Sequence, residues 1–429
     1  MNSLIEGQLV SRIIGAPFRA CEILFRGVQL GVRGVRLLLQ RKLAAKGDAL
    51  LARIGKRWLA QRSEINDRSI VMMTMQGEYT CNPKYIAEEI LRRRLPWEIT
   101  WVLRDWSIGP FPEEFKFVPY GTARYFEALA SAKVVVQNGH TLQVSGAEKG
   151  SGQYWLQTWH GSLGLKKLEG AGGDRKYYEG MRRLENAQTD LAVTNSTFED
   201  SVFSSTYWPD VEKARLGHAR NDVLFDRAPD QVATLRKKVL DRLGIRDRGQ
   251  KFLLCAPTHD DGRGSDPLNG INVATLRGAM ARKFSGEWDV LIRTHHRDKL
   301  ESEAVLAGLP AYCYNASLYP DMQELLVVAD AGLSDYSSWV CDYINTRKPA
   351  FLFSTDIETY SRQRGFYHDF ADTPFTMATS NEGLLKNIEE FDQGVYGTKI
   401  ESFLQRCGSI DDGLAAVRIV DRIEELMQR

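Results

Sequence analysis

Residues 69–103 of the chain read SIVMMTMQGEYTCNPKYIAEEILRRRLPWEITWVL. This stretch starts with a short apolar run over 69–74, continues with apolar residues at helical spacing over 83–94, and ends with a second apolar run over 97–103. A strand, a helix and another strand in this order indicate a parallel strand pair joined by a helical crossover. The stretch therefore predicts an α/β fold.

The same alternation continues along the rest of the chain. Further strands are expected at 115–118, 133–137, 154–158, 191–194, 252–256, 288–293, 329–333 and 350–353. Because the rhythm restarts beyond residue 235, we predict two Rossmann-like domains that face a cleft, over 65–232 and 233–429, the second ending in a helix. Ligands of open parallel sheets bind at the carboxyl ends of the strands. The residues that follow each strand are therefore the candidates for chemistry.

Residues 1–64 differ from the rest of the chain in charge. The first 62 residues hold 12 Lys/Arg and 3 Asp/Glu, although the 429-residue chain has a formal net charge of only +1. Basic and apolar residues alternate there at helical spacing, which predicts a basic amphipathic helical arm on an anionic membrane surface. The alternative is an arm that packs on the protein's own body or on a partner in a homo-oligomer.

Composition narrows the class of protein. No stretch reaches the roughly 20 apolar residues of a membrane span, and the first 40 residues lack the apolar core of a signal peptide. The six cysteines are scattered without a C-x-x-C pair, which indicates thiols in a reducing compartment and no zinc site. We expect a cytoplasmic protein, peripheral on the inner face of the cell membrane, and no nucleic-acid partner.

Two histidines follow predicted strands, one in each half. His160 comes directly after the run 154–158 and precedes Gly161, where a ligand has close access to the backbone. His295 follows the run that ends at Arg293. Because imidazole titrates near neutral pH, His160 is a candidate base for an attacking hydroxyl, while His295 and Arg293 are candidates for stabilising a leaving phosphate. A structural role explains either histidine alone equally well.

A third polar group stands where a strand is followed by a helix. It is Asp335-Tyr336-Ser337-Ser338, and its two serines fall at the helix start, where free amides and hydroxyls favour a phosphate. An ordinary helix cap is the alternative. Further on, Arg364 lies beside a glycine and two aromatic residues, and its guanidinium is a second candidate for a phosphate.

Several common signatures are missing from the chain. It contains no G-x-x-x-x-G-K-[ST], no G-x-G-x-x-G after a strand, no H-E-x-x-H and no G-x-S-x-G. Their absence argues against a phosphate-loop NTPase, a simple dehydrogenase, a zinc protease and a serine hydrolase.

Seven short motifs, taken in order, resemble the CDP-glycerol glycerophosphotransferase family, whose members make teichoic acids and related capsular polymers. The motifs are QTWHG (157–161), GHARND (217–222), APT (256–258), RTH (293–295), YPDMQELL (319–326), SDYSS (334–338) and RGFY (364–367). The likeness extends from Asn82 to a DDGLA motif over 411–415. It implies a GT-B fold and attack by an acceptor hydroxyl on the distal phosphate of a CDP-linked donor, with release of CMP.

The resemblance also implies roles for individual residues. His160 is then the general base, and His295 is the partner that assists the phosphate. The implied donor-binding residues are Arg293, Asp335, Ser337, Ser338, Arg364, Gly161, Asn221 and Asp222. Asn221 and Asp222 belong to a motif near the interdomain crossing, where structural support explains them at least as well.

The expected donor is CDP-glycerol, with CDP-ribitol as the alternative, and the expected acceptor is linked to prenyl diphosphate or another lipid. A nucleotide-sugar glycosyltransferase of the same fold and a membrane-bound assembly factor without activity are the other hypotheses. The chain departs from the family pattern at Ala219, His259 and His296, where Pro, Trp and Pro are usual. No metal site or cofactor is predicted, although the polar run 258–261 contains residue types that can bind a divalent cation.

Overall fold

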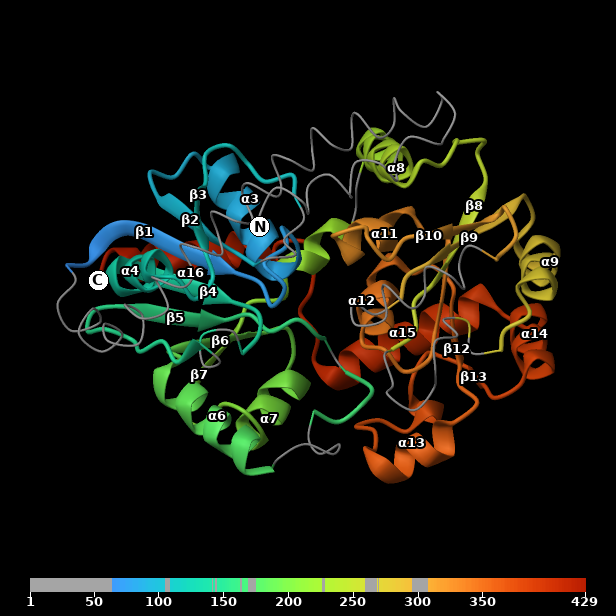
Figure 1. Ribbon diagram of the computed structural model, residues 1–429. Coiled ribbons are helices and arrows are strands. Elements are labelled where there is room, and N and C mark those ends of the chain that lie inside the picture. The colour runs from blue at the N-terminus through green and yellow to red at the C-terminus, as the bar shows by residue number, and fades with distance from the viewer. Residues whose placement is uncertain are drawn as a thin grey trace, which may run out of the picture.

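The computed structural model describes residues 64–104, 109–140, 142, 145–162, 164–168, 175–225, 228–258, 268, 270–294 and 308–429. Three expectations fall outside these ranges in whole or in large part: the amphipathic arm, of which only residue 64 is described, His295, and the polar run 258–261, of which only Thr258 is described. The described chain has an α/β structure with two parallel sheets, which confirms the α/β part of the predicted fold (Figure 1).

The first sheet has seven strands in the order β3-β2-β1-β4-β5-β6-β7. Its strands are β1 (Asn66–Met73), β2 (Glu98–Leu103), β3 (Lys116–Pro119), β4 (Ala132–Gln137), β5 (Tyr154–Gln157), β6 (Leu191–Thr194) and β7 (Glu212–Arg215). All pairings are parallel. Both faces are covered, because Ile70 and Met72 pack into one buried cluster while the alternate residues Val71 and Met73 pack into another.

The second sheet has six strands in the order β10-β9-β8-β11-β12-β13, again with parallel pairings. Its strands are β8 (Lys251–Cys255), β9 (Trp288–Ile292), β10 (Cys313–Asn315), β11 (Ala331–Ser334), β12 (Ala350–Phe353) and β13 (Met377–Ala378). In each sheet the first strand in the sequence lies inside the sheet, and the strand order reverses beside it. Ligand sites of doubly wound sheets lie at such reversal points.

The helices alternate with the strands as the apolar spacing predicts. They are α3 (Cys81–Arg92), α4 (Ala123–Ser131), α6 (Arg175–Gln188), α7 (Thr197–Ser205), α8 (Pro229–Leu243), α9 (Val273–Phe284), α11 (Met322–Val328), α12 (Trp339–Tyr343), α13 (Ile357–Gln363), α14 (Asn381–Glu389), α15 (Gln393–Cys407) and α16 (Ala415–Met427). Three 3-10 helices complete them: η1 (Ala219–Leu224), η2 (Ile344–Thr346) and η3 (Phe370–Asp372). Within the part of the chain that the structure describes, none of the helices is long and apolar enough to span a membrane.

The C-terminal helix returns to the first domain. α16 packs against α3, η1 and β4, on the side of the first sheet opposite α4 (Figure 1). Its apolar stripe, which includes Ile419 and Ile423, is fully buried there. The carboxylate of Asp222 accepts hydrogen bonds from the first amides of this helix, Ala415 at 2.9 Å and Ala416 at 2.7 Å. This helix belongs to the predicted second domain, 233–429, whereas in the folded chain it packs on the first sheet.

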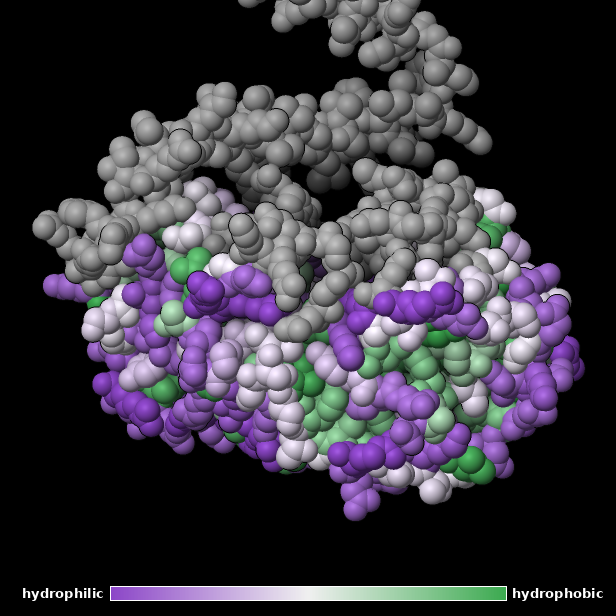
Figure 2. Space-filling view, turned by 90° about the horizontal axis from the view of Figure 1, so that it is seen from below, coloured by the Kyte–Doolittle hydropathy of each residue, from purple (hydrophilic) through white to green (hydrophobic). Residues whose placement is uncertain are grey.

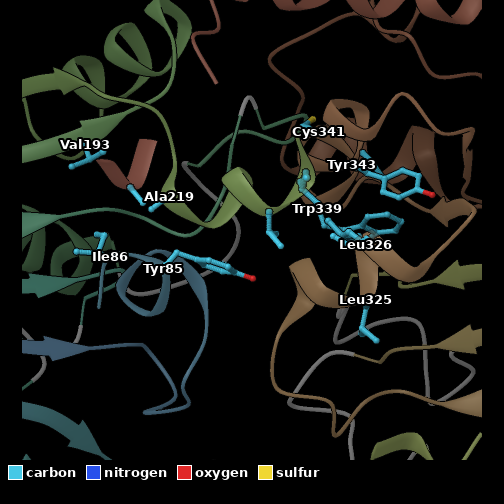
Figure 3. Close-up of a cluster of buried hydrophobic side chains, with 14 of the residues drawn as sticks. Tyr85, Ile86, Val193, Ala219, Leu325, Leu326, Trp339, Cys341 and Tyr343 are labelled. Atoms are coloured by element: carbon cyan, nitrogen blue, oxygen red, sulfur yellow. The ribbon is translucent and has the colours of Figure 1, made fainter. Parts of the chain in front are cut away.

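One buried apolar cluster joins the two domains. It contains Tyr85 and Ile86 of α3 together with Leu326 of α11 and Trp339 of α12, as Figure 3 shows. Beside it, the buried ammonium of Lys84 donates to Asp321 at 2.5 Å and to Glu324 at 2.6 Å. The two domains therefore share both a core and a buried ionic contact, which fixes how the carboxyl ends of the sheets face each other.

Candidate active site

A pocket of about 410 Å³ lies between the domains at the carboxyl ends of β4, β5, β8 and β11. We call it the interdomain pocket. The first domain lines it with His140, Trp159, His160, Gly161 and Lys166, among others, and the second with Thr258, Ser337, Ser338 and Arg364. Figure 2 views the molecule from the side of α6, α7 and α13, where hydrophilic side chains border a less polar middle region. The pocket thus brings together five of the predicted site residues.

A second hollow, of about 460 Å³, lies beside Lys84 and Glu324. None of the predicted site residues belongs to its described lining. This second hollow is slightly larger than the interdomain pocket. The residue types that suit transfer chemistry nevertheless line the interdomain pocket.

The loop after β5 directs His160 into the interdomain pocket. Trp159, the residue before it, has a φ of 51°, a left-handed conformation that bulky residues rarely adopt. Its ring is buried and packs edge-on against Trp208, with 5.6 Å between centroids. Asn82 of α3 donates to the main-chain carbonyl oxygens of Thr158 at 2.9 Å and Trp159 at 3.1 Å. These contacts hold the unusual turn, and with it the histidine.

The imidazole of His160 offers one nitrogen to the pocket. Its Nδ1 lies 2.6 Å from the main-chain carbonyl oxygen of Asn138. Because a carbonyl oxygen only accepts, Nδ1 carries the hydrogen and Nε2 keeps its lone pair. Desolvation between the domains lowers the pKa of His160 to about 4, and this effect outweighs the hydrogen bond to Asn138. The residue is nevertheless exposed to the pocket, so a neutral imidazole with a free lone pair faces this space.

The loop after β11 presents two hydroxyl groups from the opposite domain. The buried carboxylate of Asp335 accepts from the amides of Ser337 and Thr258, both at 3.0 Å. Asp335 therefore shapes the loop, while Ser337 and Ser338 line the pocket. The Ser338 hydroxyl lies only 3.6 Å from the point where a Cβ on Gly161 would stand. The loops of the two domains therefore approach each other closely at Gly161 and Ser338, at ordinary van der Waals distance.

Arg364 stands at the edge of the pocket. Its Nε donates to the main-chain carbonyl of Lys167 at 2.9 Å and its Nη1 to the hydroxyl of Tyr360 at 3.3 Å. Two main-chain hydrogen bonds, 3.1 and 2.8 Å long, link the segments 165–168 and 364–367. The segment after the His160 loop is therefore tied directly to the second domain.

Besides Asp335, three predicted donor-binding residues lie outside the lining of the interdomain pocket. Arg293 donates from Nη1 to the main-chain carbonyl of Tyr319, and burial lowers the pKa of Arg293. Asn221 is fully buried and donates to Asp411 at 2.9 Å. Asp222 holds the start of α16, and burial raises the pKa of its carboxyl to about 6. Their contacts are those of structural support near the crossing between the domains.

The role of His295 stays a prediction, because this residue lies outside the described ranges. The same holds for a cation at the polar run 258–261, of which only Thr258 is described. Within the described part of the chain, no group of three or more metal-ligand side chains is placed to hold a metal ion.

Two residues of the site were not identified by prediction from the sequence. His140 lies three residues beyond β4, the neighbour of β5, and lines the same pocket as His160. The rule that singled out His160, a polar residue after a strand, also applies to the run 133–137 and would have found it. Asn82 gives no comparable signal, because the carbonyls it holds are 76 and 77 residues away in the sequence.

The structure is that of an α/β protein with two parallel sheets and a pocket between them. More particularly, the chain belongs to the CDP-Glycerol:Poly(glycerophosphate) glycerophosphotransferase family, whose model matches residues 57–425.

Individual relatives agree with this assignment. The chain is 28% identical over 383 residues to the teichoic acid poly(glycerol phosphate) polymerase of Staphylococcus epidermidis, a match that covers 85% of this chain and 52% of that protein. It is 24% identical over 364 residues to the teichoic acid glycerol-phosphate transferase of Staphylococcus aureus, covering 81% and 90%. The chain spans about half the length of the Staphylococcus epidermidis and Bacillus subtilis polymerases that it matches.

The structure of the wall teichoic acid polymerase TagF is similar to this one. A TagF structure superimposes with a TM-score of 0.75 at 26% identity, covering 94% of this chain and 98% of that one. A TagF variant soaked with CDPG superimposes with a TM-score of 0.76 at 25% identity, with the same coverage.

Proposed function

We propose that this protein transfers glycerol phosphate from CDP-glycerol to a hydroxyl of a membrane-linked acceptor and releases CMP, in the synthesis of a teichoic-acid-like or capsular polymer. The observation that carries the proposal is the neutral imidazole of His160, whose free Nε2 faces a pocket between the two domains. Membership of the family supports the choice of donor.

In the proposed reaction, Nε2 of His160 accepts the proton of the acceptor hydroxyl as its oxygen attacks the glycerol-bearing phosphorus. A bond forms between that oxygen and the phosphorus. The bond between the phosphorus and the bridging oxygen breaks, and CMP leaves with the electron pair. The hydrogen bond from Nδ1 to Asn138 orients the ring and stabilises the imidazolium that results.

The diphosphate of the donor is proposed to lie against the hydroxyls of Ser337 and Ser338, the backbone at Gly161 and the guanidinium of Arg364. All four residues line the interdomain pocket, which supports this placement. Asp335 acts indirectly, because it positions the loop of Ser337.

The remaining predicted residues receive different proposed roles. Arg293, Asn221 and Asp222 are proposed to support the domain crossing, since their described contacts are internal. His295 is proposed to assist the leaving phosphate, on the strength of the family motif alone.

We further propose a GT-B arrangement with an acceptor-side domain over 65–232 and a donor-side domain over 233–429, whose last helix lies across the first sheet. The strand orders of the two sheets support this arrangement. The arm over 1–64 is proposed to bind the anionic inner face of the cell membrane, on the strength of its charge and spacing.

An assay of CMP release tests the proposal. Purified full-length protein is incubated with a prenyl-diphosphate-linked acceptor and with CDP-glycerol, CDP-ribitol or a UDP-sugar. CMP formation from CDP-glycerol, with glycerol phosphate added to the acceptor, is expected. Release of CMP from CDP-ribitol alone would assign the other polyol, and release of a nucleoside diphosphate alone would overturn the reaction type.

A further inference from the structure

A second histidine lies in the interdomain pocket, paired with a carboxylate that the proposed reaction does not use. His140 Nδ1 is 2.8 Å from Oε2 of Glu185 on α6, and the two side chains are 22% and 0% exposed. The ring N–H is not aligned with that oxygen, so the contact is an ion pair rather than a well-formed hydrogen bond. Neither oxygen of Glu185 accepts a hydrogen bond from any residue that the structure describes.

The chemistry of this pair follows from its burial. A fully buried carboxylate without a hydrogen-bond donor is costly unless it is protonated or faces a cation. Burial raises the pKa of Glu185, and His140 opposes that rise. The imidazole of His140 is the basic group that stands against this carboxylate. A ring N–H that faces the pocket can donate to an anion that enters it.

Aromatic rings hold His140 in place beside the proposed base. Its ring centroid is 5.3 Å from that of Trp159, in an edge-on contact, and 5.1 Å from that of Tyr207. Trp159 also lies against His160, with 4.3 Å between centroids. The positive charge of His140 helps to lower the pKa of His160, so the two histidines act on each other within one pocket. Since His140 lines the pocket, its exposed part is accessible to a ligand there.

We propose that His140, paired with Glu185, binds a phosphate of the acceptor and so sets the attacking hydroxyl against His160. This inference rests on the proposed function. The description of the family names poly(glycerophosphate), and in such an acceptor the terminal glycerol bears both the free hydroxyl and a phosphodiester. An imidazolium is a suitable partner for a phosphate oxygen.

His140 lies on the side of the pocket that favours a phosphate of the acceptor over a phosphate of the donor. His140 and His160 follow neighbouring strands of the first sheet, β4 and β5. The hydroxyls proposed for the donor diphosphate, on Ser337 and Ser338, belong to the second domain. A phosphate held by His140 therefore lies on the same side as the base that must reach the acceptor hydroxyl.

Steady-state kinetics on the full-length protein test the inference with two acceptors. One is a prenyl-diphosphate-linked acceptor that ends in glycerol phosphate, and the other carries an uncharged methylphosphonate in place of its last phosphodiester. The variants are His140→Gln, His140→Arg and Glu185→Gln. Glu179→Gln is the matched control, because Glu179 is an exposed carboxylate on the same helix.

A charge-specific result is expected. The wild type should prefer the phosphodiester acceptor by about tenfold or more in KM, as one charge-assisted contact allows. His140→Gln and Glu185→Gln should lose this preference and keep the KM for CDP-glycerol within about twofold, which also shows that they fold. His140→Arg should retain the preference, and the Glu179→Gln control should behave as the wild type does.

The contrary outcomes separate this inference from the proposed function. An equal preference in the wild type and His140→Gln would overturn the inference while leaving the transfer reaction intact. A rise in the KM for CDP-glycerol with an unchanged acceptor KM would do the same, because His140 would then serve the donor. Absence of CMP release by the wild type would instead overturn the proposed function itself.

Discussion

The side-chain amide of Asn82 donates to the main-chain carbonyl of Trp159 at 3.1 Å, so the first turn of α3 holds the loop that carries His160. The other hydrogen bond from this amide goes to the carbonyl of Thr158, and its oxygen accepts from the amide of Arg220 at 3.0 Å. Asn82 is completely buried. One side chain therefore joins α3, the loop after β5 and η1.

Replacing Asn82 with Ala should lower both activity and stability. We expect kcat to fall by about 10- to 100-fold, because a small displacement of a catalytic group is costly. The free energy of unfolding should fall by about 1–3 kcal/mol, since buried carbonyls lose their donor. CMP release and urea unfolding measure the two effects. Asn387→Ala on α14, outside the lining of the interdomain pocket, is the control, and a normal kcat in Asn82→Ala would contradict the proposed support.

Replacing His160 should remove turnover and preserve the fold. His160→Ala and His160→Gln lack the proton acceptor, so we expect kcat to fall by about 10²- to 10⁴-fold. Binding of CDP-glycerol, measured by calorimetry, should stay within about threefold of the wild type. The family motif predicts the same pattern for His295→Ala. A wild-type rate in either histidine variant would exclude that residue from the mechanism.

The pH dependence should reflect the lowered pKa of His160. Desolvation lowers this pKa to about 4, so the imidazole is neutral above that value and loses its lone pair only below it. With saturating acceptor, kcat/KM for CDP-glycerol should therefore be flat through neutral pH and fall only in the acid range, below the usual histidine pKa of about 6.5. An acid limb centred at or above pH 6.5 would show that His160 is not the base in this environment.

Breaking the buried ionic contact between the domains should destabilise the protein. Lys84→Met leaves the carboxylates of Asp321 and Glu324 buried with one cation fewer. We expect the free energy of unfolding to fall by about 3–5 kcal/mol, because the loss of one partner leaves a buried charge uncompensated. Urea unfolding followed by tryptophan fluorescence measures this change.

A surface lysine provides the comparison for Lys84. Lys237 on α8 pairs with Asp241, and both side chains are largely exposed. Lys237→Met should therefore change the free energy of unfolding by no more than about 0.5 kcal/mol. Equal effects of the two substitutions would contradict a special role for the buried contact.

Deleting residues 1–60 should weaken membrane association. A basic amphipathic arm binds anionic vesicles partly through charge, so the loss should be largest at low salt. Sedimentation with vesicles of anionic and of zwitterionic lipid measures it, and CMP release from a water-soluble acceptor checks that the remaining chain is folded. If the truncated protein pelleted with anionic vesicles as the full chain does, the arm would have no such role.

The family motifs and five residues of the pocket could be predicted, because they follow from the order of residues within short segments. Apolar runs with a period of two or of 3.6 residues specify strands and helices wherever they occur. Carboxyl ends of parallel strands meet at one edge of a sheet, so residues after strands, such as His160, Ser337 and Ser338, could be expected to converge. The structure brings these three residues to one pocket.

The remaining features depend on how segments far apart in the sequence pack. Asn221 and Asp222 stand in a family motif, but the folded chain turns them towards Asp411 and the start of α16. The return of α16 to the first sheet has no signal in its own periodicity, which is that of any amphipathic helix.

The order of residues along the chain was enough to predict the α/β class, the family and the place of His160, the proposed base, after its strand. The hydrogen bond from Nδ1 of His160 to Asn138, the place of His140 in the same pocket and the burial of Glu185 beside it follow from the folded structure alone. This is because the burial of a polar group and its partners arise only when the two domains pack together. Burial and partners set the charge and the orientation of a side chain, and the position of the residue in the sequence gives no information about either.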